Sequence, residues 1–154
     1  MLFRSFFHIF PGGEIQMLFR ANYNIDVPTN KPAELYYSGD MGETWDSRVL
    51  PGDTRESSDW YYADFLDPDT GWLMQVNGGE VFFTEDGGRS WVSLTSVNWT
   101  GQLHFISRDL GWAVAWPLDD YQYIYYYYPW QYGLLHTSDG GRTWEQFSPV
   151  LATP

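Results

Sequence analysis

The sequence Thr84-Glu-Asp86-Gly-Gly88-Arg-Ser90-Trp91 recurs twice more in this chain of 154 residues. The other two copies are Ser38-Gly-Asp40-Met-Gly42-Glu-Thr44-Trp45 and Thr137-Ser-Asp139-Gly-Gly141-Arg-Thr143-Trp144. Each copy has a hydroxyl residue, then Asp at +2, Gly at +4, a second hydroxyl at +6 and Trp at +7. Five matched positions in three copies establish an internal repeat, and a repeat at this period predicts an architecture of repeated structural units.

The residue types in the pattern predict a tight hairpin turn. Glycine adopts a positive φ without strain, and Asp before Gly is a strong turn signal because its carboxylate accepts hydrogen bonds from backbone N–H groups one or two residues further on. We expect the leading Ser or Thr to donate to that carboxylate, and the Trp ring to seal the gap to a neighbouring unit. The apolar runs before each turn are the expected incoming strands; they are Leu35–Tyr37, Val81–Phe83 and Leu134–Leu135.

The pattern resembles the Asp-box, or bacterial neuraminidase repeat, which marks one four-stranded blade of a β-propeller. The resemblance implies that each box lies on the turn between the third and fourth strands, on the face away from the ligand site. The box acids are therefore expected to form turns and not to act as catalytic acids or metal ligands. The structural positions that the resemblance assigns are Ser38, Asp40, Gly42, Trp45, Thr84, Asp86, Gly88, Trp91, Thr137, Asp139, Gly141 and Trp144.

A second repeated phrase predicts the first two strands of each blade. Phe65-Leu-Asp-Pro-Asp69-Thr-Gly71-Trp72 matches Phe105-Ile-Ser-Arg-Asp109-Leu-Gly111-Trp112. In both, Phe is followed by Asp at +4, Gly at +6 and Trp at +7, which indicates a strand, a polar turn and a second strand. We align Phe10–Met17 as a divergent first copy, with Met17 in the Trp position.

The combination of the two phrases is similar to the propellers of the photosystem II stability and assembly factor family and its bacterial relatives. Sialidases and the sortilin luminal domain share the box but less of the Phe/Gly-Trp phrase. The resemblance favours an extracytoplasmic location, although the apolar start MLFRSFFHIF is followed by no small-residue cleavage site for a signal peptide.

Composition and charge narrow the class of partner. The chain is 44% apolar and 20% aromatic, and its turn residues recur about every ten positions, so the predicted class is all-β. A formal net charge of −12 argues against nucleic acid or an anionic membrane surface as a partner. It is compatible with a basic protein partner, with a high-salt environment or with an extracytoplasmic protein. The absence of cysteine excludes disulfides and thiol chemistry, and no apolar stretch approaches the roughly 18 residues of a membrane helix.

The spacing of the boxes predicts three blades in one partial β-propeller over 1–154, at about 1–48, 55–95 and 100–148. Closed propellers have roughly four to eight blades, and an open arrangement leaves edges that invite pairing. Two explanations follow: the chain is a piece of a longer propeller, or it closes by associating with itself through its open blade edges.

The longest insertion lies between the second and third strands of the third blade, on the face opposite the boxes. The segment Pro117–Tyr132 contains seven Tyr and one Trp, residues that suit protein interfaces and sugar stacking. One interpretation is a contact surface; the other is a long hairpin whose alternating tyrosines pack on their own neighbours. The candidate surface is formed by Tyr121, Tyr123, Tyr125, Tyr127, Trp130 and Tyr132.

No catalytic or metal-binding residue is predicted, and no cofactor. Sialidase chemistry needs an arginine cluster that the sequence does not match, and Asp119 and Asp120 are adjacent, so on a strand their side chains point to opposite faces. His8, His104 and His136 stand singly in apolar strands, where packing is the expected role. The sequence therefore favours a non-enzymatic, protein-binding propeller. The alternatives are a fragment of a propeller glycoside hydrolase or carbohydrate-binding protein, and a purely structural repeat module.

Overall fold

The structure is a computed structural model that describes residues 6–19, 33–51, 61–76, 78–118 and 133–148. These residues form twelve β-strands and no α-helix, so no described helix is long and apolar enough to cross a membrane. The strands make three four-stranded antiparallel sheets, here called blades 1, 2 and 3. The prediction of an all-β chain built from four-stranded meanders is confirmed.

Each blade is a meander in which neighbouring strands follow each other in sequence. Blade 1 contains β1 (Phe6–Ile9), β2 (Ile15–Phe19), β3 (Glu34–Ser38) and β4 (Asp46–Val49). Blade 2 contains β5 (Tyr61–Phe65), β6 (Gly71–Gln75), β7 (Glu80–Thr84) and β8 (Val92–Ser96). Blade 3 contains β9 (Trp99–Phe105), β10 (Gly111–Pro117), β11 (Gly133–Thr137) and β12 (Glu145–Phe147).

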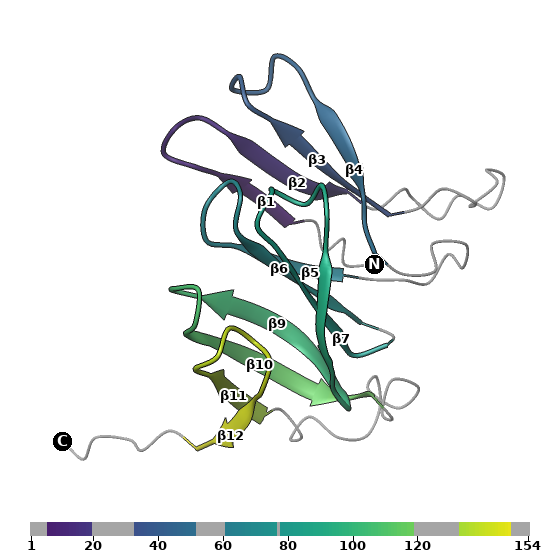
Figure 1. Ribbon diagram of the computed structural model, residues 1–154, viewed down its shortest axis with the longest axis vertical. Helices are drawn as coiled ribbons and strands as arrows, with labels where there is room; N and C mark the ends of the chain where they lie inside the picture. The colour runs from purple at the N-terminus through teal and green to yellow at the C-terminus, as the bar shows by residue number, and fades with distance from the viewer. Residues whose placement is uncertain (1–5, 20–32, 52–60, 77, 119–132, 149–154) are drawn as a thin grey trace, which may run out of the picture.

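The blades pack face to face in chain order, with blade 2 in the middle (Figure 1). Because side chains alternate across a strand, each blade offers one face to each neighbour. One apolar cluster joins blade 1 to blade 2 through residues such as Leu18, Leu35 and Leu73, and a second joins blade 2 to blade 3 through Met74 and Leu103. The first strands lie next to each other, β1 beside β5 and β5 beside β9.

Trp72 fixes the junction between blades 2 and 3. Its side chain is fully buried and its ring stacks on Phe105 of blade 3, with centroids 3.7 Å apart and planes inclined by 3°. Its Nε1–H donates to the carbonyl of Gly140, in the third Asp-box turn, at 2.9 Å. One side chain thus supplies both the apolar contact and the polar link across the junction.

Blade 1 uses different side chains at its junction with blade 2. Gln16 pairs with His8 and Tyr37, the register that Trp72 has in blade 2, and its Nε2 donates to the carbonyl of Pro68 at 2.8 Å. The alignment that placed Met17 in the Trp position is therefore wrong by one residue. Both side chains are N–H donors that reach the next blade, but Gln16 bonds to the turn between β5 and β6, whereas Trp72 bonds to the turn between β11 and β12.

The turns between the third and fourth strands of the blades, here called the box turns, share one hydrogen-bond pattern. In the second box, Thr84 Oγ1 donates to Asp86 Oδ1 at 2.8 Å and accepts from the N–H of Gly88 at 2.9 Å. Asp86 also accepts from the N–H of Ser90 at 2.8 Å and from its hydroxyl at 2.5 Å. The expected hydroxyl-to-carboxylate bond is present, but the backbone donor lies four residues on, because the carboxylate spans the whole loop. The same set recurs around Asp40 and Asp139.

These hydrogen bonds hold the pKa of each box carboxyl low. For Asp40 the hydroxyl and backbone N–H of Thr44, with the Ser38 hydroxyl, lower the pKa from its ordinary 3.8 to about 2. For Asp86 and Asp139 burial raises the pKa, but the surrounding hydroxyl and N–H donors outweigh it and bring the value to about 2. All three are therefore charged acceptors in the folded protein at neutral pH.

The box turn and the turn of the second phrase are joined within each blade. The N–H of Gly87 donates to the carbonyl of Asp69 at 2.8 Å, and that of Gly140 donates to the carbonyl of Asp109 at 2.9 Å. Both glycines have positive φ, 70° and 76°. The two repeated phrases therefore occur together because their backbones bond to each other at the same end of the blade.

Replacing Asp86 with Asn is expected to lower the free energy of unfolding by about 1 kcal/mol at pH 7, the lower end for a charge-assisted hydrogen bond because solvent screens the group. A carboxyl whose pKa is lower in the folded state stabilises the fold above its unfolded pKa, and this is lost as pH falls through the folded value. The difference between variant and wild type should therefore shrink between about pH 4 and pH 2. Urea unfolding at several pH values measures it, with exposed Asp69→Asn as the control; a difference that does not change with pH would contradict the prediction.

Replacing Trp72 with Phe is expected to cost about 2 kcal/mol, because it opens a small cavity and leaves the Gly140 carbonyl without its donor. Trp144→Phe is the matched control: it removes a hydrogen bond of 3.1 Å within one turn, to the carbonyl of Gly141. Chemical unfolding should show the larger loss for the Trp72 variant. Equal losses would mean that the link between the blades contributes nothing of its own.

Candidate functional site

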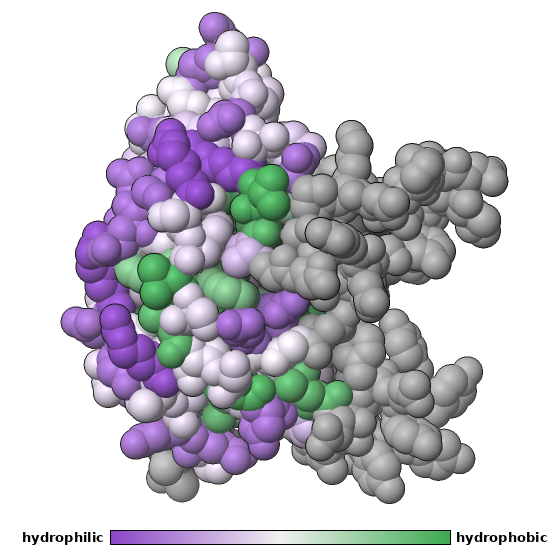
Figure 2. Space-filling model, turned by 45° about the vertical axis from the view of Figure 1, so that its right-hand side comes forward, coloured by the Kyte–Doolittle hydropathy of each residue, from purple (hydrophilic) through white to green (hydrophobic). Residues whose placement is uncertain are grey.

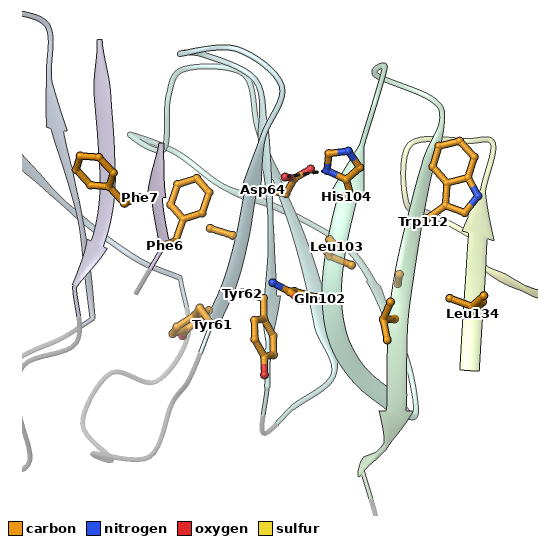
Figure 3. A pocket seen from close by; sticks show the side chains of 13 residues that line it. Phe6, Phe7, Tyr61, Tyr62, Asp64, Gln102, Leu103, His104, Trp112 and Leu134 are labelled. Atoms are coloured by element: carbon orange, nitrogen blue, oxygen red, sulfur yellow. Dashed lines mark ion pairs between the residues drawn. The ribbon is translucent and has the colours of Figure 1, made fainter. Parts of the chain in front are cut away.

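A hollow of about 830 Å³ opens along the first strands of the three blades. Figure 3 shows its lining, which combines aromatic side chains, aliphatic side chains and one ion pair. The residues come from all three blades: Phe6, Phe7, Tyr61, Tyr62, Ala63, Asp64, Gln102, Leu103, His104, Trp112, Ala113, Val114 and Leu134.

The polar centre of the hollow is the pair Asp64 and His104. Both occupy the same position in their blades: Asp64 pairs with Trp72, and His104 pairs with Trp112. Their side chains approach across the junction of blades 2 and 3, with Nδ1 of His104 3.6 Å from Oδ1 of Asp64 (Figure 3). The second oxygen, Oδ2, accepts a hydrogen bond of 2.6 Å from the N–H of Phe105.

Asp64 is the buried member of the pair. Its side chain is 18% exposed, against 74% for His104. Burial raises the pKa of the Asp64 carboxyl, and the Phe105 N–H and the neighbouring His104 oppose that rise without cancelling it. Because the charged carboxylate loses hydration at this place, a cationic group brought into the hollow would gain a partially desolvated partner.

Aromatic and aliphatic residues stand on either side of this pair, and the surface of the hollow is polar and apolar in similar measure. Tyr62 meets Trp116 edge to face, with ring centroids 5.8 Å apart, and Phe6 lies 5.9 Å from Phe65. Trp112 lines the blade 3 side. A concave surface that combines apolar area with polar groups can hold a ligand.

The histidines do not share one role. The His8 ring lies 4.3 Å from that of Phe10, tilted by 37°, and the His136 ring lies 5.4 Å from that of Trp112, both consistent with packing. For His104 the packing interpretation is wrong, because its side chain is exposed and faces Asp64. Each blade carries a polar residue at this place, immediately before the final residue of the first strand: His8, Asp64 and His104.

The sequence does contain a signal for this pair. Asp64 and His104 each directly precede the Phe of the second repeated phrase. The repeated phrase therefore extends one residue further upstream, to a polar position. The meander places this position on the first, innermost strand of each blade.

The described residues that line the hollow include few groups that could act in hydrolysis or hold a metal ion. Asp64 is the only carboxylate among the lining residues, whereas glycoside hydrolysis uses two acids across a cleft. Within the described parts of the chain, no three His, Asp or Glu side chains are grouped so as to hold a metal ion.

The residues predicted from sequence fall in two other places. The box residues lie in the turns described above, apart from the hollow lining. The tyrosine-rich candidates lie outside the described residues: Tyr121, Tyr123, Tyr125, Tyr127, Trp130 and Tyr132. The strands that flank them, β10 and β11, meet this segment at the end of blade 3 away from the box turn.

Comparison with known proteins supports the fold. No family model matches the chain, and no curated protein does. Among solved structures, one described as "YCF48 bound to D1 peptide" is similar, with a TM-score of 0.55 and 17% sequence identity. The match covers 86% of this chain and 35% of that chain. At this identity the likeness concerns the fold, and it agrees with a β-propeller arrangement of the three blades.

Replacing Asp64 with Asn tests the electrostatics of the hollow. A carboxyl whose pKa is raised in the folded state favours folding while protonated, and that contribution is lost as pH rises through the folded pKa. Asn keeps an acceptor for the Phe105 N–H but stays neutral. The free energy of unfolding of the variant, relative to wild type, should therefore be higher at pH 7 than at pH 4. Thermal or urea unfolding at the two pH values measures this, and an unchanged difference would contradict the raised pKa.

Proposed function

We propose that this chain is a non-enzymatic β-propeller scaffold that binds a segment of another protein in the hollow along its first strands. The observation that carries the proposal is the hollow itself, an aromatic and aliphatic concavity of about 830 Å³ with a half-buried carboxylate at its centre. An extended peptide needs this combination of apolar area and a few fixed polar groups.

Two further observations support a protein partner. The sequence phrases resemble the photosystem II assembly-factor family, and the similar solved structure is described as YCF48 bound to D1 peptide. In that structure a propeller of related fold holds a peptide. We extend that class of ligand to this chain.

The negative net charge of the chain favours a basic segment of the partner protein. The chain carries a formal net charge of −12, which attracts basic partners over long range and raises their association rate. Asp64 would then meet a Lys or Arg side chain inside the hollow, while Phe6 and Tyr62 would contact the apolar residues beside it. The tyrosine-rich segment 121–132 would add a second contact surface at the same blade.

A carbohydrate ligand is the runner-up, favoured by the aromatic rings and Gln102 in the lining. Aromatic faces stack on sugar rings, and amides bond to hydroxyl groups. A glycan array and a peptide array incubated with the same protein distinguish the two ligand classes.

The test is an array of synthetic peptides of equal length that differ in net charge. Basic peptides with aromatic or aliphatic residues should be captured, and capture should weaken as salt is added. For a captured peptide, Asp64→Asn should raise the dissociation constant by roughly tenfold, since a charged pair in a partly desolvated place is worth more than a surface pair.

Two sets of variants give this experiment its controls. Asp69→Asn removes an equal charge from an exposed turn and should leave the dissociation constant within about twofold, because surface charges are screened. Tyr125→Ser combined with Tyr127→Ser reports on the tyrosine-rich segment: weaker capture with unchanged melting temperature assigns it to binding. Capture of glycans without peptides, or equal capture of acidic and basic peptides, would overturn the proposal.

A further inference from the structure

The two end blades expose apolar side chains that the middle blade does not. Among the described residues, nine large hydrophobic side chains are exposed, five in blade 1 and three in blade 3 but only Val92 in blade 2. Figure 2 shows hydrophobic groups reaching the surface in its lower part, at the level of blade 3. Three of them, Phe7 and Ile9 in blade 1 and Val114 in blade 3, lie on strands, on the face of each end blade that has no neighbouring blade among the described residues.

The open face of blade 3 repeats the face by which blade 2 packs on blade 3. Trp112 and Val114 have the register of Trp72 and Met74. Trp72 and Met74 are completely buried, whereas Val114 is 45% exposed. Leu134, opposite Val114, has the register of the buried Val81.

The open face of blade 1 corresponds to the face by which blades 2 and 3 each pack on the preceding blade. Ile9 and Met17 have the register of Phe65 and Leu73, which are buried in the junction with blade 1. Ile9 is 60% exposed and Phe7 is 56% exposed. In Figure 3 Phe7 points away from blade 2, while Phe6 points toward it.

The open faces also carry the donor and the acceptor of the hydrogen bond that links neighbouring blades. The acceptor is the carbonyl of the box residue between Asp and Gly, here called the middle residue. At the two internal junctions it accepts from the preceding blade: Gly87 from Arg48, and Gly140 from Trp72. In the first box the middle residue is Met41, whose φ of 57° matches the positive φ of those glycines. Trp112 occupies the donor position in blade 3, and none of its described contacts is the counterpart of the Trp72 bond.

We propose that two copies of this chain associate head to tail, with the open face of blade 3 of each copy on the open face of blade 1 of the other. The three described blades of one copy and the three of a second make six, within the roughly four to eight blades of closed propellers. Two copies related by a twofold axis would form two identical new junctions. In each, Trp112 Nε1–H would donate to the Met41 carbonyl.

This association rests on the outer faces and not on any bound ligand, so it stands apart from the proposed function. It does bear on the hollow, whose lining includes Phe7 at one end and Trp112 and Val114 at the other. A second copy would cover both ends and turn the open hollow into part of an enclosed channel.

The experiment is the solution mass of the chain, measured by light scattering and sedimentation over a wide range of protein concentration. The expected result is a dimer of twice 18.0 kDa, favoured by added salt because salt screens the repulsion between two chains of net charge −12. A monomer at every concentration, or an open series of larger species, would overturn the proposal.

Variants then test the pairing of faces. Trp112→Phe keeps the ring but removes the donor and should weaken each junction by roughly tenfold. Met17→Asp and Trp112→Asp should each abolish the dimer, while a mixture of the two should recover a weaker heterodimer, because one of its two junctions is unaltered. Ile106→Ser, in an exposed turn away from both faces, is the control. Circular dichroism confirms that each variant is folded, and recovery of no heterodimer in the mixture would rule out head-to-tail pairing.

Discussion

The bond from a side chain of one blade to a backbone carbonyl in the next blade's box turn is the interaction on which this architecture depends. Blade 2 has apolar side chains on both faces and cannot bury both alone. Packing faces together supplies most of the free energy, but apolar contact is non-directional and fixes no register between sheets. The carbonyls of Gly87 and Gly140 add direction, because each accepts a hydrogen bond from the preceding blade, Gly87 from Arg48 on the fourth strand and Gly140 from Trp72 on the second.

The box is built to present that carbonyl. The box carboxylate holds the loop closed by accepting hydrogen bonds from both of its ends, and the box glycines at positive φ turn the peptide plane outward. The N–H of the same middle residue bonds back to the first turn of its own blade. One peptide unit therefore joins a blade to itself and to its neighbour, which explains why Gly stands at this place in two boxes and why the acids serve the turn. At the first junction the donor is Arg48, whose guanidinium is buried and stacks 4.1 Å over the Tyr37 ring; burial lowers its pKa.

The fold could be predicted from the sequence because the strongest signals in the sequence are local. The Asp, Gly and Trp spacings are turn chemistry, and turn chemistry determines hairpins irrespective of what packs on them. The first blade was harder to align, because its Trp position is held by Gln16, which donates to a different acceptor, the Pro68 carbonyl. Only the strand register identifies the match. The site was harder still. Asp64 and His104 are 40 positions apart and meet only because consecutive first strands lie side by side, a relation that depends on blade packing and not on local pattern.

The strand register also shows how the open face of blade 3 differs in chemistry from the corresponding face of blade 2, which is buried against blade 3. Where blade 2 has Tyr62 and Phe83, blade 3 has Gln102 and His136, while Trp112 and Leu134 keep the apolar character of the centre. A face buried for the life of the fold gains from apolar residues at every position. A face that meets both water and a partner needs an apolar centre with a polar surround, the anatomy of non-obligate interfaces. Blade 3 therefore carries the polar residues Gln102 and His136 on the face that has no neighbouring blade in the described structure, whereas Leu103 and Phe105 keep its other face apolar.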